Sequence, residues 1–322
     1  MKHWFGIAVV AGVLMAAGAA HAQDFPTKPL RIVVPFAPGG NVDITARTIA
    51  TPLGELLGQS IVVENKPGAG GMLATSQVIK GAADGYTLVL GSSSTISVAP
   101  ATMRNALYDP AKELATVGPI QAVPIIISAS VKSGITTYRE FAARAQARPG
   151  AVGVASAGTG TSNHLALELL MKQTGLKWLH VPYKGSGLAL VDVVGGQVDT
   201  MIDQLTASIQ HIREGRLKPL VVTTRKRSAQ LPEVPTLVEM GVKDFDVSTF
   251  TGLFAPAGTP KPVLDKLTAG LARVLAQPAV RERFASLGVD MIDSDARSFD
   301  AYVKKDYENW RAVAREANIV LE

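Results

Sequence analysis

The stretch LRIVVPFAPGGNVDITARTIATPLGELL, residues 30–57, contains the pattern that decides the fold. Leu30 to Val34 is a short run rich in β-branched residues, which predicts a strand. A loop from Pro35 to Gly40 follows, and from about Val42 the apolar residues recur at helical spacing. We therefore predict a strand, a glycine-bearing loop and a helix in immediate succession.

The same order of elements recurs along the rest of the chain. Further strands are predicted at residues 61–63, 86–90, 123–128, 152–155, 178–181, 198–202, 220–223 and 250–255, with helices between most of them. Alternating strands and helices are typical of an α/β fold with mostly parallel sheets flanked by helices. Ligands of such folds bind at the carboxyl ends of the strands.

The order of the elements also indicates how the domains are divided. From residue 260 onward the chain becomes rich in predicted helix, and we expect this segment to pack back on the first domain. We expect lobe I, a discontinuous domain of residues 23–127 and 249–322, and lobe II, residues 128–248. In this arrangement the chain crosses between the lobes twice.

The N-terminus has the features of a signal peptide. Lys2 and His3 precede an apolar run from Trp4 to Ala17, and Ala20-His21-Ala22 forms an A-x-A cleavage pattern. We predict a signal peptide over residues 1–22, cleaved after Ala22, and export of the mature chain. The apolar run is short for a membrane span and no cysteine is present to carry a lipid, so we expect no membrane anchor. An uncleaved anchor is the alternative.

The composition excludes several classes of protein. Hydrophobic residues make up 47% and charged residues 18% of the 322 residues, which suits a globular chain and argues against disorder. Because there is no cysteine, disulfides, thiol catalysis and thiolate metal sites are excluded. The formal charge is +5, but the basic run Arg225-Lys226-Arg227 has no interleaved aromatic residues. We therefore expect no nucleic-acid binding.

Two glycine-bearing loops are candidate anion-binding sites. Pro35–Asp43 and Ser156–His164 each join the end of a predicted strand to the start of a predicted helix. The N–H groups at a helix start lack partners, and the helix dipole adds about half a positive charge there. Glycine lets a ligand approach the backbone closely, so such loops can bind a carboxylate without a cationic side chain.

Each of these loops leaves an alternative open. The first could be a plain turn in which Asp43 caps the helix instead of contacting a ligand. The second is rich in hydroxyl groups, and His164 in it either contacts the ligand or orients the residues that do.

Three other strand ends add candidates. Gly91–Ser94 and Val181–Gly185 follow predicted strands, and Tyr183 could supply a flat apolar wall with a hydroxyl tip. Lys184 is either the counter-ion of a carboxylate or a solvent-exposed lysine. Asp203 could accept hydrogen bonds from ligand hydroxyls or from waters, or it could cap the following helix.

The predicted binding site therefore combines residues from five loops. The predicted ligand-contacting residues are Phe36, Ala37, Pro38, Gly39, Gly40, Asp43, Ser92, Ser93, Ser156, Thr159, Gly160, Thr161, His164, Tyr183 and Asp203. Within this set, we expect a carboxylate to be gripped by Gly39, Gly40, Thr159, Gly160 and Thr161, with Lys184 dispensable.

The sequence contains no clear pattern for catalysis or for binding a metal or cofactor. The nearest match to a G-x-S-x-G nucleophile elbow, Val154 to Gly158, has valine in place of the first glycine. His164, His180 and His211 lie far apart and show no metal-ligand spacing. Gly39-Gly40 fits neither a G-x-G-x-x-G nor a Walker motif. We predict a binding protein and not an enzyme, with no metal and no cofactor.

Seven short motifs stand in order along the chain: PFAPGG (35–40) with Asp43, ENKPGAGG (64–71), DGYT (84–87), GTGTSNH (158–164), VPYKG (181–185), LPEVPT (231–236) and FAPAGTP (254–260). This set resembles that of the Bug family, the receptors of tripartite tricarboxylate transporters. The resemblance covers nearly the whole mature chain.

The resemblance implies a periplasmic, two-lobe clamp of the Venus-flytrap type that closes on its ligand. In this family a ligand carboxylate is typically held by backbone amides of the two glycine-bearing loops, often through ordered waters. The resemblance also implies a small carboxylate ligand (a mono- or dicarboxylate, an amino acid or an aromatic acid) and delivery to a membrane permease of the tripartite tricarboxylate type. We expect a monomer. The alternatives are a solute-sensing module that serves a signalling protein and an exported hydrolase that uses Ser156 and His164.

Overall fold

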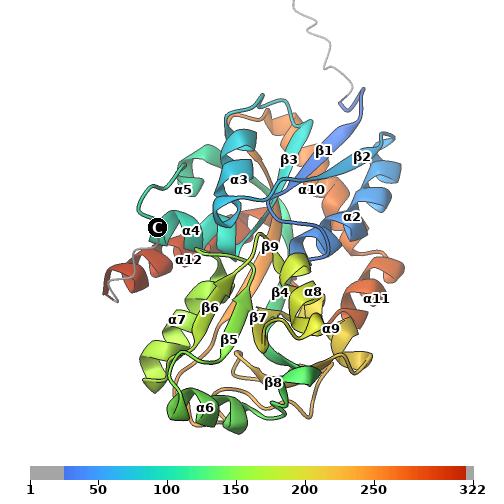
Figure 1. The fold of residues 1–322 in the computed structure, drawn as a ribbon. Helices are drawn as coiled ribbons and strands as arrows, with labels where there is room; N and C mark the ends of the chain where they lie inside the picture. The colour runs from blue at the N-terminus through green and yellow to red at the C-terminus, as the bar shows by residue number, and fades with distance from the viewer. Residues whose placement is uncertain (1–24, 317–322) are drawn as a thin grey trace, which may run out of the picture.

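The chain folds into two α/β lobes, as predicted, and the strands of both lobes join in one mixed sheet (Figure 1). The computed structural model describes residues 25–316. The strands are β1 (Leu30–Val34), β2 (Ile61–Asn65), β3 (Thr87–Ser92), β4 (Leu114–Ser130), β5 (Gly153–Ser156), β6 (Leu179–Pro182), β7 (Thr200–Gln204), β8 (Leu217–Val222), β9 (Ser248–Pro256) and β10 (Asp290–Met291). The helices are α2 (Asn41–Leu57), α3 (Met72–Ile79), α4 (Ala99–Thr102), α5 (Pro110–Glu113), α6 (Tyr138–Ala147), α7 (Ser162–Thr174), α8 (Ser186–Gly195), α9 (Leu205–Arg213), α10 (Lys261–Leu275), α11 (Pro278–Ser286) and α12 (Ala296–Glu316). Short helical turns are η2 (Ala69–Gly71), η3 (Ser93–Val98, a π-helix) and η4 (Val131–Ser133).

The sheet follows the order β2-β1-β3-β9-β4-β7-β5-β6, and β8 and β10 also pair with β4. In the first lobe β1 pairs parallel with β2 and β3, and in the second lobe β5 pairs parallel with β6 and β7. The strands in the middle are antiparallel to their neighbours. The sheets are therefore mixed and not mostly parallel, because β4 and β9 carry the chain between the lobes as extended strands.

The long strand β4 takes part in both lobes. Its residues 114–124 pair with β9, and its residues 125–130 pair with β7 and β8. The chain returns beside this point, where Thr223 donates its N–H to the carbonyl of Ile125 and its hydroxyl to the carbonyl of Val247. Two extended segments thus lie side by side where the lobes meet.

The apolar cores lie on opposite faces of β4. Ile126 packs into a cluster with residues of α2 and α10, whereas Ile125 and Ile127 belong to a second cluster. In the second cluster the rings of Phe141 and Trp178 stack with their centroids 4.7 Å apart. All three isoleucines are fully buried, as expected for a strand whose successive side chains point to opposite faces.

The first helix is placed as its apolar spacing predicted. In α2, Ile49, Leu53 and Leu57 are buried against the first core. The helix ends at Gly58, whose left-handed backbone (φ 72°) lets its N–H bond the carbonyls of the last turn. The predicted helical C-terminal segment is also confirmed, because α12 packs on the first lobe through Phe299, which meets Phe250 and Phe254 of β9.

Some elements were not predicted from the sequence. The segment between β3 and β4 forms η3, α4 and α5, and β4 itself begins at Leu114. The sequence SSTISV of η3 has no apolar periodicity that would predict a helix. Strand β10 is only two residues long, which is too short for a strand pattern to be recognised in the sequence.

Candidate functional site

The loops singled out from the sequence meet where the two lobes face one another. Each follows the carboxyl end of a strand: β1 leads to α2 and β3 to η3 in the first lobe, while β5, β6 and β7 lead to α7, α8 and α9 in the second. Figure 1 shows these strand ends pointing toward the gap between the lobes. Five helix N-termini are thereby brought together.

A small cavity lies between these helix starts. Its volume is about 20 Å³, and its lining contains no charged residue. The lining residues are Phe36, Gly40, Asn41, Val42, Ser92 and Ser94 from the first lobe and Ala157, Ser186 and Gln204 from the second. Phe36, Gly40 and Ser92 belong to the predicted set, whereas the other lining residues were not named in it.

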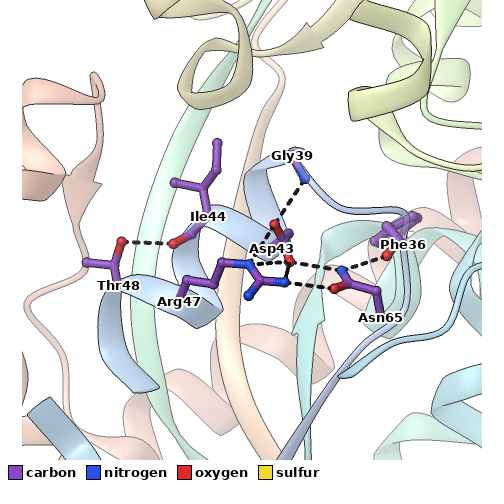
Figure 2. A network of polar contacts seen from close by, with 7 residues as sticks. All are labelled: Phe36, Gly39, Asp43, Ile44, Arg47, Thr48 and Asn65. Carbon is purple, nitrogen blue, oxygen red and sulfur yellow. Dashed lines mark hydrogen bonds and ion pairs between the residues drawn. The ribbon is translucent and has the colours of Figure 1, made fainter. Parts of the chain in front are cut away.

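Asp43 holds the first glycine-bearing loop in place (Figure 2). Its carboxylate accepts hydrogen bonds from the Gly39 N–H at 3.0 Å, Arg47 Nε at 3.0 Å and Asn65 Nδ2 at 2.9 Å. Burial acts to raise the pKa of Asp43, but these hydrogen bonds hold it below its ordinary value. The Gly39 amide, expected to face a ligand, is thus bonded to Asp43. Ligand contact by Asp43 itself stays a prediction.

The start of α2 is left open toward the cavity. Gly40 is its N-cap, in extended conformation, and no side chain caps the helix. The N–H groups of a first helical turn have no intrahelical acceptor, so an uncapped start presents free donors. The partial positive charge of the helix dipole lies at the same place.

The start of α8 faces that of α2 from the second lobe. Gly185 is its N-cap, again with no side-chain cap. A Cβ atom built on Gly40 would lie 3.4 Å from Ser186 Cβ, so the two helix starts are almost in contact. The loops on either side also touch, because Ala37 donates its N–H to the carbonyl of Lys184 at 3.1 Å. A Cβ atom on Gly187 would lie 1.9 Å from the carbonyl oxygen of Pro38.

The start of α7 is capped by its own loop. Thr161 accepts the His164 N–H at 3.4 Å and donates its hydroxyl to the carbonyl of Gly158 at 2.7 Å. His164 Nδ1 accepts the Gly160 N–H at 3.3 Å, and its Nε2 lies 3.4 Å from a carboxylate oxygen of Glu168. These bonds hold His164 within the loop, and which of its two predicted roles it has toward a ligand stays a prediction.

Two serines connect the lobes directly. Ser162 donates its N–H to Ser94 Oγ at 3.0 Å, and the two hydroxyl oxygens are 2.9 Å apart. A second contact lies nearby, since a Cβ atom on Gly70 would be 2.8 Å from the carbonyl oxygen of Thr159. The Thr159 side chain makes no hydrogen bond to any residue that the structure describes.

Ser156 pairs with a histidine other than the one expected. Its Oγ lies 2.6 Å from His180 Nε2 and accepts the Gly158 N–H at 3.1 Å. The His180 ring stacks on that of His164 with centroids 3.9 Å apart. Burial, with a contribution from His164, lowers the pKa of His180 to about 4. Ser156 is fully buried, so its hydroxyl is closed off from solvent.

Two other residues of the predicted set, Ser93 and Tyr183, are tied into the scaffold. Ser93 Oγ accepts the Phe250 N–H at 2.8 Å, which fixes η3 to β9. The Tyr183 hydroxyl donates to Asp192 Oδ2 at 2.6 Å, and burial followed by this carboxylate raises the pKa of Tyr183 to about 12. Lys184 is exposed, and its contact with the other lobe is made by its carbonyl.

Asp203 lies fully buried behind the second-lobe wall of the cavity. Its Oδ1 accepts from Ser186 Oγ at 2.5 Å and from Asn163 Nδ2 at 2.9 Å. Gln204 Nε2 in turn donates to Asn163 Oδ1 at 2.8 Å. Within the described residues, Asp203 Oδ2 has no hydrogen-bond partner. Burial raises the pKa of Asp203 to about 6 despite the hydrogen bonds from Ser186 and Asn163.

The set of residues predicted from the sequence does not include Ser186, Asn163 or Gln204. Ser186 and Asn163 stand in the first turns of α8 and α7, and Gln204 is the last residue of β7. Their position at a strand end or a helix start was the available signal. The sequence does not show which of several polar residues there turns inward.

The described part of the chain has neither a helix suited to crossing a membrane nor a cluster suited to holding a metal ion. Among residues 25–316, no helix combines the length and the apolar character that a membrane crossing needs. The same stretch of chain contains no group of three or more His, Asp or Glu side chains placed to hold a metal ion. The predicted signal peptide lies outside the described residues.

Comparison with known proteins identifies relatives along the whole chain. The sequence model for the tripartite tricarboxylate transporter family receptor matches residues 45–319. Protein BugT of Bordetella pertussis is 35% identical over 98% of this chain and 98% of its own length. The structure of the periplasmic binding protein BugD is 37% identical, with a TM-score of 0.88, over 92% of this chain and 99% of that one.

Two of the similar structures contain ligands. MatC (Rpa3494) from Rhodopseudomonas palustris, with bound malate, is 35% identical with a TM-score of 0.86, over 90% of this chain and 99% of that one. Rpa4515 from the same organism, with adipate, is 33% identical with a TM-score of 0.87, over 92% of this chain and 99% of that one.

The raised pKa of Asp203 predicts a specific dependence of stability on pH. Between its ordinary pKa of 3.8 and its folded pKa of about 6, the native state holds more of this proton than the unfolded chain. Asp203 therefore lowers the free energy of unfolding as the pH rises through that window. Relative to the unsubstituted protein, Asp203→Asn should gain about 2 kcal/mol between pH 4 and pH 7, measured by urea unfolding.

His180 provides the control for this measurement. Its pKa is lowered from 6.5 to about 4, so its contribution has the opposite sign and favours the native state as the pH rises. His180→Gln should consequently lose stability relative to the unsubstituted protein over the same range. A difference for Asp203→Asn that does not change with pH would mean that Asp203 ionises as it does in the unfolded chain.

Proposed function

The chain belongs to the tripartite tricarboxylate transporter receptor family, and from this premise we propose that it captures a small carboxylate between its lobes and delivers it to a membrane permease of that transporter type. One observation carries the proposal. The uncapped N-termini of α2 and α8 face one another across a cavity with no charged residue in its lining. Helix starts bind anions through free N–H groups and the helix dipole.

The energetics suit a reversible carboxylate receptor. Each hydrogen bond to a charged group contributes about 1.5–3 kcal/mol. A few such bonds, less the entropy lost on capture, support micromolar binding, which corresponds to about −8.2 kcal/mol. A lysine or arginine in the site would be costly to desolvate on closure, whereas main-chain amides carry no net charge.

The liganded relatives support the choice of a carboxylate. Malate and adipate, bound by MatC and Rpa4515, are both dicarboxylates, although only malate carries a hydroxyl group. We propose that this chain also binds a carboxylate. The residues that line the cavity then determine which ligand carries that carboxylate. The fifteen residues predicted from the sequence are proposed as the surrounding shell, and Gly40 among them lines the cavity.

Binding requires the lobes to move. Ligand pockets usually enclose about 300–1,000 Å³, far more than the roughly 20 Å³ between the lobes here. We propose that lobe I (23–127 and 249–322) and lobe II (128–248) open and close about the paired segments of β4 and β9. The contact of Pro38 with Gly187 is a contact of the closed form.

We further propose that the chain acts in the periplasm and has no catalytic activity. The Ser156 hydroxyl is fully buried and already bonded, which argues against the hydrolase. Export follows from the signal peptide predicted over residues 1–22. N-terminal sequencing of the protein from the cell envelope should begin at Gln23, and recovery of the uncleaved chain in the cytoplasm would contradict export.

Substitutions at Gly40 and Lys184 test how the carboxylate is held. Gly40→Val keeps an extended backbone but directs two methyl groups at Ser186, so calorimetry should show dicarboxylate affinity reduced at least tenfold, about 1.4 kcal/mol. Lys184→Ala keeps the carbonyl that bonds Ala37 and should change affinity less than threefold. If Lys184→Ala abolishes binding and Gly40→Val does not, the grip is a salt bridge.

Gly187→Ala tests closure separately. An added Cβ would meet the Pro38 carbonyl at 1.9 Å only when the lobes are closed, while alanine suits the interior of α8. Small-angle scattering should show that saturating ligand reduces the radius of gyration of the unsubstituted protein more than that of this variant. The variant should also bind at least tenfold more weakly. Gly195→Ala is the control on the same helix, because the nearest atom to its Cβ, Gln197 Cγ, is 3.9 Å away. Equal compaction of both variants would contradict the clamp.

A further inference from the structure

The side chains on the second-lobe wall of the cavity have a defined hydrogen-bond polarity. This wall consists of Ala157, Ser186 and Gln204, and Asp203 lies directly behind it. An ionised carboxylate can only accept hydrogen bonds. Every group bonded to Asp203 must therefore point a donor at it, which fixes the direction of the neighbouring bonds.

The first consequence concerns Gln204. Because Asn163 points its Nδ2 at Asp203 at 2.9 Å, its Oδ1 is turned toward Gln204 and accepts from Nε2 at 2.8 Å. One of the two Nε2 protons of Gln204 is thus engaged inside the lobe. Its Oε1 makes no hydrogen bond to the described residues and is not among the fully enclosed polar atoms, so it is left as an acceptor at the cavity.

The second consequence concerns Ser186. A serine hydroxyl has one proton, and Ser186 donates it to Asp203 Oδ1 over 2.5 Å. Toward the cavity, which Ser186 lines, its oxygen can then only accept. Both polar side chains of this wall therefore offer an acceptor, and the donors at the cavity include the main-chain N–H groups of the uncapped helix starts.

The main-chain donors and the side-chain acceptors at the cavity bind different groups of a ligand. A ligand carboxylate has no proton to give to Ser186 or Gln204 and is matched by the helix starts. We propose that Ser186 and Gln204, held in orientation by Asp203 through Asn163, select ligands that carry a hydrogen-bond donor, a hydroxyl or an ammonium group, next to the carboxylate. This rests on the proposed carboxylate-binding function and adds the substrate class, 2-hydroxy or 2-amino carboxylates.

The expected discrimination is large for a single group. A site built to bond a ligand hydroxyl rejects the analogue that lacks it, because buried acceptors are then left unpaired. Even one such acceptor should give at least a tenfold higher affinity for the donor-bearing ligand than for the analogue without the donor, equivalent to about 1.4 kcal/mol.

The test is calorimetry on the mature protein with matched carboxylates that differ in one group. The series are succinate, malate and aspartate; glutarate, 2-hydroxyglutarate and glutamate; adipate and 2-hydroxyadipate; propionate, lactate and alanine; and 3-phenylpropionate, 3-phenyllactate and phenylalanine. In the series that binds most tightly, a donor-bearing member should exceed the plain carboxylate at least tenfold in affinity. Ser186→Ala and Gln204→Met should each lower that ratio below threefold.

The ratio separates selection from a merely structural effect. A variant that only disturbs the fold weakens all members of a series together and leaves the ratio unchanged. Ser76→Ala, a buried serine of α3, and Gln210→Met, an exposed glutamine of α9, are matched controls and should retain the full ratio.

The experiment also distinguishes a failure of this inference from a failure of the proposed carboxylate-binding function. If no carboxylate of any series binds, the proposed function fails and this inference fails with it. If plain carboxylates bind as tightly as their donor-bearing partners, or if the ratio survives both wall substitutions, the inference is wrong while the carboxylate-binding function stands.

Discussion

The structure depends on one strand that pairs in both lobes at once. Because β4 bonds β9 over its first part and β7 and β8 over its second, it joins the strands of the two lobes in one sheet. The N-terminal end of α2 is tied to the same strand, since Gln121 of β4 donates to Asn41 Oδ1 and Thr45 Oγ1, both at 2.7 Å. The uncapped helix start is thereby held rigidly against the segment about which we propose that the lobes move.

Binding and stability place opposite demands on the helix starts. A side-chain cap commonly stabilises a helix by about 1 kcal/mol, and Thr161 supplies one to α7. The starts of α2 and α8 have glycine at that position and lack a side-chain cap. Asp43, which lies in the first turn of α2, supports the loop from behind by bonding Gly39, Arg47 and Asn65, and so leaves the cavity side of the helix start unobstructed.

Local sequence patterns predicted most of the fold and part of the site. The apolar spacing of α2 and the triple isoleucine of β4 follow from periodicity and burial, and both were placed correctly. The mixed sheet could not be predicted, because strand direction depends on pairings between distant segments such as β4 and β9. The same limit applies to the site: the sequence identified the loops, but whether Ser186 or Tyr183 faces the cavity is decided by contacts with Asp203 and Asp192.

In the proposed site, Asp203 acts through its charge without being exposed to the ligand. A carboxylate in the cavity would repel an anionic ligand, yet one lying behind the wall still determines which way the Ser186 hydroxyl and the Asn163 amide point. Burial without full pairing costs stability, as the raised pKa of Asp203 reflects. That cost is consistent with selection for a fixed hydrogen-bond direction, since a neutral amide at this position would let its neighbours turn either way. The same fold could then accept a different ligand after changes confined to the wall, while the two helix starts continued to hold the carboxylate.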